Sequence, residues 1–119
     1  MGVHTLDISQ RTFKFGVEIV KLSFELPRNS AGFAISGQII RSGTSVGANT
    51  EEAQNASSKK EFIRCLTIAL KEAREAMYWL KLIKEVGLLS EEKLVKLLQE
   101  NLELVKILTA IVKNSKLKK

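Results

Sequence analysis

The stretch "IIRSGTSVGANTEEA", residues 39–53, places Gly43 and Gly47 among serines and threonines. Such a composition occurs in phosphate-binding loops and in tightly packed helices. A P-loop carries a lysine and a hydroxyl residue directly after its last glycine, because both groups contact the bound triphosphate and its Mg²⁺. Ala48 and Asn49 stand there instead. A dinucleotide-binding turn follows a hydrophobic strand, and no alternating β-branched run precedes these glycines. The sequence therefore disfavours both kinds of loop.

Helical periodicity explains the same stretch better. At about 100° per residue, its apolar side chains fall on one face of a helix. These side chains are Ile35, Ile39, Val46 and Ala53. Gly43 lies beside this face and Gly47 lies one turn later, so that another backbone can approach closely. Each glycine costs about 0.5–1 kcal/mol of helix stability relative to alanine, which close packing has to offset. We expect both glycines inside a helix that packs against another helix.

Long segments with little punctuation surround this stretch. The chain has 119 residues, 45% of them hydrophobic, and a single proline, which indicates one all-α domain. Cap signals predict four helices, at about 7–26, 33–55, 58–86 and 90–115. The first begins with an Asp7 to Gln10 capping box and stops at Pro27, and the third begins at Ser58 with Glu61. Gly87 ends the third helix, and Ser90 begins the fourth.

Each helix has an apolar stripe at helical spacing. In the first helix, Phe13, Val17, Val20 and Phe24 share one face. In the third helix the predicted buried residues are Phe62, Leu66, Ala69, Ala73, Met77 and Leu80, and in the fourth they are Leu94, Leu98, Leu102, Val105, Leu108 and Val112.

Composition limits the possible functions. The net charge is +6 and the sequence pI is about 9.6, which favours polyanionic partners such as nucleic acid. The single cysteine, Cys65, excludes an intramolecular disulfide, and no signal peptide or membrane span is apparent, so we expect a cytoplasmic protein without membrane association. His4 has no companions at metal-ligand spacing, and Cys65 has only this distant histidine as a base. We therefore expect no enzyme activity, metal or cofactor.

A polar stripe adjoins the apolar face of the second predicted helix. Its members are Gln38, Arg41, Ser45, Asn49 and Glu52. Glu72 and Glu75 border the apolar stripe of the third helix, so an ion pair from Arg41 to either carboxylate is feasible at a helix seam. We interpret these residues as a structural network or an interface rather than as a catalytic carboxylate pair. Tyr78 and Trp79 could stack on bases, but the wheel places Trp79 near Glu72 and Glu75, which favours packing in the seam.

The segments "QIIRSGTSVGANTEEA" and "SSKKEFIRCLTIALKEAREAMYWLKLI" resemble those of the four-helix-bundle proteins related to proteins encoded by intervening sequences in bacterial 23S ribosomal RNA genes. The resemblance runs from about "RTFKFGVEIVKL" to Val86. It covers the five residues of the polar stripe together with Ser57, Phe62, Ala69 and Glu72. The sequence departs from the family pattern at Ala53, where a glycine is common, and at Ala56, where a basic residue is common.

This resemblance implies an antiparallel up-and-down four-helix bundle that assembles into a homopentameric ring with a basic surface. It also implies a role as an accessory protein, since similar bundles act with retroelement reverse transcriptases. The function hypothesis is a non-enzymatic homo-oligomer that binds RNA or DNA through backbone phosphates. The candidate phosphate-binding residues are Lys59, Lys60, Arg64, Lys113, Lys116, Lys118 and Lys119. The alternative is a structural or protein-interaction module, such as a scaffold for a reverse transcriptase or another ribonucleoprotein component, with no direct contact to nucleic acid.

Overall fold

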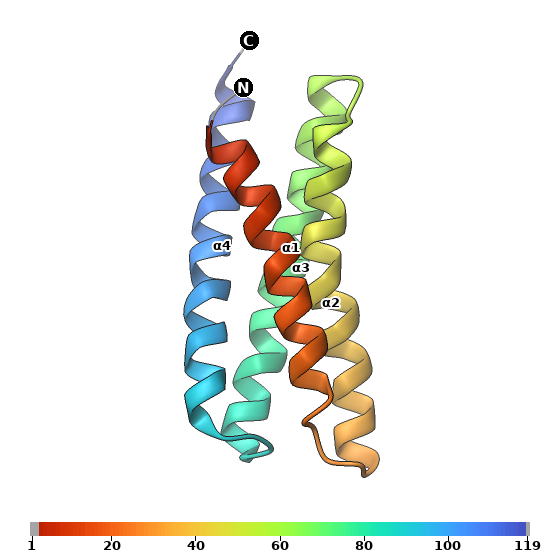
Figure 1. Ribbon diagram of the computed structural model, residues 1–119. Coiled ribbons are helices and arrows are strands. Elements are labelled where there is room, and N and C mark those ends of the chain that lie inside the picture. Colours follow the sequence, from red (N-terminus) through yellow and green to blue (C-terminus); the bar gives the residue numbers. More distant parts are fainter. Residues whose placement is uncertain (1–2, 119) are drawn as a thin grey trace.

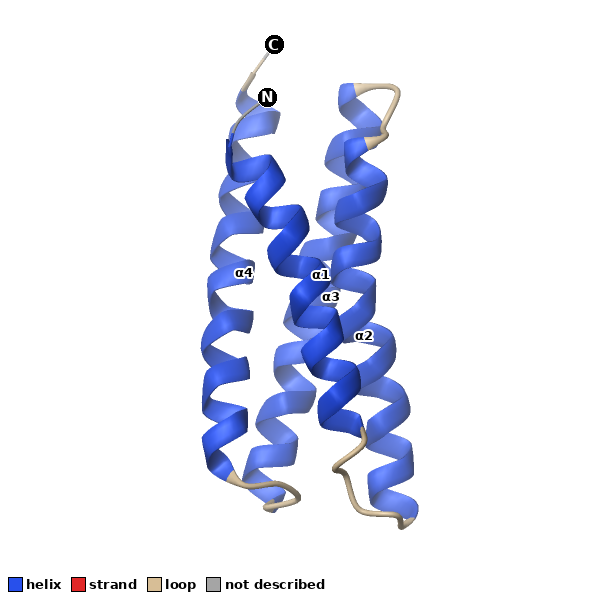
Figure 2. Ribbon diagram, viewed as in Figure 1, coloured by secondary structure: helices blue, strands red, loops and turns tan. Residues whose placement is uncertain are grey.

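Four helices run along the long axis of the molecule in the computed structural model, which describes the backbone of residues 3–118 and the side chains of residues 8–118 (Figure 1). The helices are α1 (Val3–Ser23), α2 (Ser30–Gln54), α3 (Lys59–Val86) and α4 (Glu91–Leu117). They alternate in direction, and both chain ends lie at the end of the bundle that also holds the α2–α3 connection. No strand occurs within residues 3–118, and only short loops join the helices (Figure 2). The expected all-α four-helix fold is confirmed.

The helices pack mainly against their neighbours in sequence. Contacts are extensive between α1 and α2, between α2 and α3, and between α3 and α4, whereas α1 and α4 meet over a smaller area. Within the described part of the chain, α1 and α3 are diagonal and have no close backbone approach. The outer faces of α1 and α3 therefore point to different sides of the bundle.

Several helix ends follow local capping chemistry, and others differ from the prediction. Helix α1 ends at Ser23, three residues before the predicted end at 26, and Ser90 precedes α4 without a side-chain capping bond. Ser58 caps α3 by accepting a hydrogen bond from the Glu61 N–H at 3.1 Å, as predicted. The backbone of α1 is already helical at residues 3–6, so its start is earlier than the predicted Asp7. The start of α2 is also earlier than predicted, because the Asn29 side chain accepts from the Gly32 N–H at 2.8 Å. The predicted start at about residue 33 did not take account of Asn29 as a cap.

Both glycines of the opening stretch lie inside α2, as expected, and they pack against α1. A Cβ atom at Gly43 would lie 2.8 Å from two side-chain carbons of Ile19, which is fully buried. A Cβ atom at Gly47 would lie 3.0 Å from the carbonyl oxygen of Thr12. These glycines therefore serve the packing of α2 on α1 within one chain. The expected close contact with another helix is therefore confirmed.

The face of α1 that lies in the core is not the face that carries Phe13 and Phe24. Phe13 and Phe24 share a face, as the periodicity indicates, but they are 73% and 78% exposed. The face in the core consists of Ile8, Thr12, Phe15, Ile19 and Leu22. Helix α1 is thus apolar on two sides, and only one of them is covered by this chain.

The predicted stripes of α3 and α4 are largely, but not entirely, buried. In α3, Leu66, Ala69, Ala73 and Leu80 are buried as predicted, and Phe62 and Met77 are partly buried. In α4, Leu94, Leu108 and Val112 are buried and Leu98 and Val105 partly so.

Leu102 is 39% exposed, and its neighbour Asn101 is fully buried in its place. With its amide nitrogen facing α3, Asn101 donates to the Ala73 carbonyl at 2.9 Å and accepts from the Met77 N–H at 3.0 Å. These bonds satisfy a buried polar side chain that is not part of the predicted apolar stripe of this helix.

Candidate nucleic-acid interface

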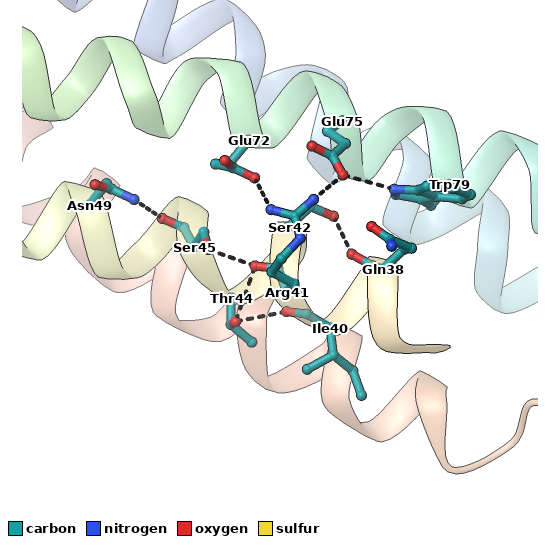
Figure 3. Close-up of polar contacts among 10 residues, drawn as sticks. All are labelled: Gln38, Ile40, Arg41, Ser42, Thr44, Ser45, Asn49, Glu72, Glu75 and Trp79. Carbon is teal, nitrogen blue, oxygen red and sulfur yellow. Dashed lines mark hydrogen bonds and ion pairs between the residues drawn. The ribbon is translucent and has the colours of Figure 1, made fainter. Parts of the chain in front are cut away.

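A charged cluster joins α2 to α3 near the middle of the bundle (Figure 3). Arg41 donates to Glu72 Oε1 at 3.1 Å and also pairs with Glu75. Glu75 in turn accepts from the indole Nε1 of Trp79 at 3.1 Å. The Arg41 side chain is 49% exposed, whereas that of Glu72 is 14% exposed. The expected ion pair is therefore present at the helix seam, but it is partly exposed to solvent and not deeply buried.

The remaining members of the predicted polar stripe contact their own helix. Ser45 donates to the Arg41 carbonyl at 2.6 Å, and Asn49 donates to the Ser45 carbonyl at 2.9 Å (Figure 3). Gln38 and Glu52 are exposed, and the described residues include no ion-pair partner for Glu52. The structure thus brings together Arg41, Glu72 and Glu75, while the other four stripe residues form no bond between helices.

A row of cations occupies the outer face of α3. The row is defined by Lys60, Arg64, Lys71, Arg74 and Lys81, which recur at spacings of three, four and seven residues and are all exposed. At about 1.5 Å per residue, the row extends over about 30 Å of helix. Apart from Arg64, which pairs with Glu61 at 2.6 Å, no member forms an ion pair with another described residue. We call these five residues the α3 cation row.

Arg41 contributes to the electrostatics of this row. Glu72 and Glu75 lie on α3 beside the row, and both carboxylates are held toward α2 by Arg41. One guanidinium offsets one of their two negative charges across the seam. A polyanion at the outer face of α3 therefore meets less repulsion from these carboxylates than it would without Arg41.

The candidate cations named from sequence gather at one end of the bundle. Lys59, Lys60 and Arg64 lie in the first turns of α3. Lys113 and Lys116 lie in the last turns of α4, and the start of α3 and the end of α4 are at the same end of the bundle (Figure 1). Lys118 is exposed at the C-cap, and Lys119 lies outside the described residues. The sequence reading missed Lys71, Arg74 and Lys81, although their helical spacing opposite the buried stripe of α3 would have revealed them.

Glu61, Arg64 and Cys65 form a small group near the start of α3. The Arg64 guanidinium, which is hydrogen-bonded to Glu61, lowers the pKa of that carboxyl, and the Arg64 pKa rises in return. Burial raises the pKa of the Cys65 thiol, and the Glu61 charge acts in the same direction. A thiol held in its protonated form is a poor nucleophile. No cluster of three or more metal-ligating side chains occurs among the described residues.

The fold and the charge pattern define a class: a basic four-helix bundle that carries a row of exposed cations along α3. Among the described residues, no helix has the length and apolar character needed to cross a bilayer. The model of the 23S rRNA-intervening sequence protein family matches residues 4–110, and the chain belongs to this family. No curated protein matches the chain.

A solved structure supports the same assignment. The chain is similar to the crystal structure of a protein of unknown function from the S23 ribosomal protein family of Bacteroides thetaiotaomicron, with 38% sequence identity and a TM-score of 0.87. The similarity covers 93% of this chain and 99% of that chain.

Proposed function

We propose that this protein binds RNA or DNA through backbone phosphates, with the α3 cation row as the main contact surface. The observation that carries the proposal is the continuous exposed row itself, whose members except Arg64 have no acidic partner among the described residues. The family name, which refers to an intervening sequence in ribosomal RNA, is consistent with a role near nucleic acid. Lys59 and the lysines at the end of α4 add positive charge at the end of the bundle where α3 begins.

The chemistry of the row favours contacts to phosphate over contacts to base edges. Lysine ammonium groups on flexible stems act as point charges and hold no fixed orientation. Reading a base edge usually requires a rigid bidentate side chain such as arginine on guanine or asparagine on adenine. Three of the five cations in the row are lysines. Binding should therefore be largely independent of sequence and should weaken steeply with salt, because phosphate contacts release counterions.

Self-association is the second part of the proposal. The resemblance to the family implies a homopentameric ring, and an exposed apolar surface on α1 supports assembly. Phe13 and Phe24 are mostly exposed, and Val17 and Val20 lie between them on the same face. A contiguous apolar patch of this kind is typical of a protein contact. A ring would present several cation rows at once and would raise the apparent affinity through avidity.

The same apolar face favours one alternative. A protein-interaction module would use Phe13 and Phe24 to bind a different protein, for example a reverse transcriptase, and its positive charge would serve solubility. This alternative predicts no binding of nucleic acid by the isolated protein.

Binding measurements with matched variants distinguish the two. The test variant replaces Lys71, Arg74 and Lys81 with glutamine, and a control variant replaces three exposed lysines outside the row, Lys14, Lys96 and Lys106. Both variants lose the same net charge. The proposal predicts that only the row variant loses most of its affinity for mixed-sequence RNA and DNA, and that the slope of log affinity against log salt flattens by up to about 3 units.

Absence of binding by the wild-type protein at low salt would refute the nucleic-acid proposal. Equal losses of affinity in the two variants would show that binding depends on net charge alone and not on the α3 cation row. Light scattering during gel filtration tests the assembly, since a clean monomer would contradict the ring.

A further inference from the structure

One aromatic ring interrupts the α3 cation row. Tyr78 follows Arg74 by four residues and precedes Lys81 by three, so all three residues share the outer face of α3. The tyrosine is 59% exposed, and its hydroxyl makes no hydrogen bond within the described part of the chain. A large aromatic side chain on this exposed helix face, which carries Thr67 and Glu85 beside the cations, contributes little to this chain's own core.

The Tyr78 ring packs against Trp79, which is itself held by Glu75 and Arg41. Its centroid lies 5.0 Å from that of Trp79, with an angle of 79° between the ring planes, which is an edge-to-face arrangement. Trp79 is fixed by its hydrogen bond to Glu75, and Glu75 is fixed by Arg41 (Figure 3). The sequence reading placed Trp79 in the seam, and the structure does so too, which leaves Tyr78 as the aromatic residue available to a ligand. A restrained ring loses less conformational entropy when it binds.

We propose that Tyr78 stacks on an unpaired base of a single-stranded nucleic acid whose neighbouring phosphates lie on Arg74 and Lys81. This inference rests on the proposed binding of nucleic acid by the α3 row. An aromatic ring within a cationic groove or row is the arrangement by which proteins bind single strands without sequence preference, because every base has a π-face. In a duplex the base faces are already stacked on each other, so a duplex would engage the cations alone. The protein therefore prefers single-stranded segments over duplexes.

The test compares a deoxythymidine single strand of about 16 nucleotides, the upper end of known single-strand site sizes, with a deoxyadenosine–deoxythymidine duplex of the same length. Three proteins are measured by fluorescence anisotropy: the wild type, Tyr78→Ala and Tyr78→Phe. Tyr78→Ala should lower the affinity for the single strand about tenfold, which corresponds to about 1.4 kcal/mol, and should leave its salt slope unchanged. Its affinity for the duplex should stay within about twofold, and Tyr78→Phe, which keeps the ring, should bind both ligands as the wild type does.

Trp79, the only tryptophan, supplies a second readout. A base stacked on Tyr78 lies next to the indole, so the single strand should quench tryptophan fluorescence in the wild type and in Tyr78→Phe, and less so in Tyr78→Ala. Circular dichroism and light scattering confirm that each variant keeps its helices and its oligomeric state.

The outcomes separate this inference from the proposed function. If the wild type binds and the cation-row variant does not, but Tyr78→Ala binds the single strand as the wild type does, the stacking inference is wrong and phosphate binding stands. An equal loss for single strand and duplex would also refute stacking, and a change in oligomeric state in Tyr78→Ala would show that a second copy covers the ring. If the wild type binds neither ligand, both proposals fail.

Discussion

Replacement of Gly43 by alanine should not stabilise the protein although alanine is the better helix former. The added methyl group would lie 2.8 Å from Cγ1 and from Cγ2 of Ile19. These atoms are near the root of a β-branched side chain that is fully buried, so they cannot rotate away. Overpacking of this kind costs about 1–3 kcal/mol.

A second glycine of the same helix provides the control. Gly37 also lies inside α2, but it is exposed, and a Cβ atom there would have no neighbour within 4 Å. Both substitutions gain about 1 kcal/mol of helix propensity. Gly37→Ala should therefore raise the free energy of unfolding by up to about 1 kcal/mol, while Gly43→Ala should change it by between about zero and a loss of 2 kcal/mol.

Urea unfolding and thermal melts at one fixed protein concentration measure this difference of about 1–3 kcal/mol, or about 4 °C in Tm per kcal/mol. The fixed concentration matters because association shifts apparent stability. In an Ile19→Ala background the obstructing atoms are absent, so Gly43→Ala should recover its propensity gain, and the double-mutant cycle should give a coupling of about 1–3 kcal/mol. Equal stability of Gly37→Ala and Gly43→Ala, or a coupling below about 0.5 kcal/mol, would refute the packing argument.

Three further predictions concern charged groups. Arg41→Ala should lower the free energy of unfolding by only about 1–2 kcal/mol in urea titrations. The ion pair is weakened by solvent because the Arg41 side chain is half exposed, but the substitution leaves the less exposed Glu72 unpaired. A larger loss would show that the cluster is buried in an assembly. Truncation after Asn114 should leave the melting temperature nearly unchanged, since surface changes stay within about 0.5 kcal/mol, while nucleic-acid affinity and its salt slope fall; unchanged binding would remove the tail from the contact surface. The Glu61 pKa is lowered in the folded state, so its pairing with Arg64 stabilises the protein above the ordinary carboxyl pKa of 4.5, and this contribution is lost as the pH falls through the lowered value. Melting curves of Glu61→Gln should therefore differ from wild type at neutral pH and converge with it in acid, and a constant difference would contradict the assignment.

Local chemistry accounts for most of what the sequence predicted correctly. Gly43 and Gly47 could be placed inside a helix because the apolar residues around them keep a helical period and because the residues after them exclude a P-loop. Ser58 was recognisable as a cap from its position three residues before Glu61. The Arg41 ion pair could be anticipated because seam positions on two adjacent helices can be read from their wheels.

The faces of helices were harder to assign than their existence. Helix α1 has apolar residues on two sides, and periodicity alone cannot show which side meets the core. The side with Phe13 and Phe24 has the more regular aromatic pattern, yet these two rings are exposed, because the close approach of α2 at Gly43 and Gly47 is to the side of α1 that carries Thr12 and Ile19. In α4, periodicity likewise could not predict that Asn101 is buried. Its burial depends on hydrogen bonds to backbone groups of α3 that are 24–28 residues away in sequence.

The α3 cation row shows the opposite case, in which the sequence held the information. The buried stripe of α3 was assigned correctly from Leu66 to Leu80, so the residues opposite it had to be exposed. Lys71, Arg74 and Lys81 occupy those positions. Lysines that are adjacent or nearly adjacent in sequence, as at the helix ends, are a more obvious signal than cations that come together only through the helical repeat.

The diagonal arrangement of α1 and α3 makes the two proposed surfaces compatible. The apolar side of α1 and the cation row of α3 lie on helices that do not contact each other among the described residues, so the two surfaces do not overlap within one copy. In a ring, the α1 patch of one copy meets a different surface of the next copy, and the α3 rows and Tyr78 stay accessible when that surface lies on α2 or α4. Separate rows on one particle would bind separate segments of a single strand, and the strand would have to remain unpaired between them to reach from one row to the next. Assembly and single-strand preference would then reinforce each other: loss of the α1 contact through Phe13 and Phe24 should weaken binding to long single strands more than binding to short ones that occupy one row.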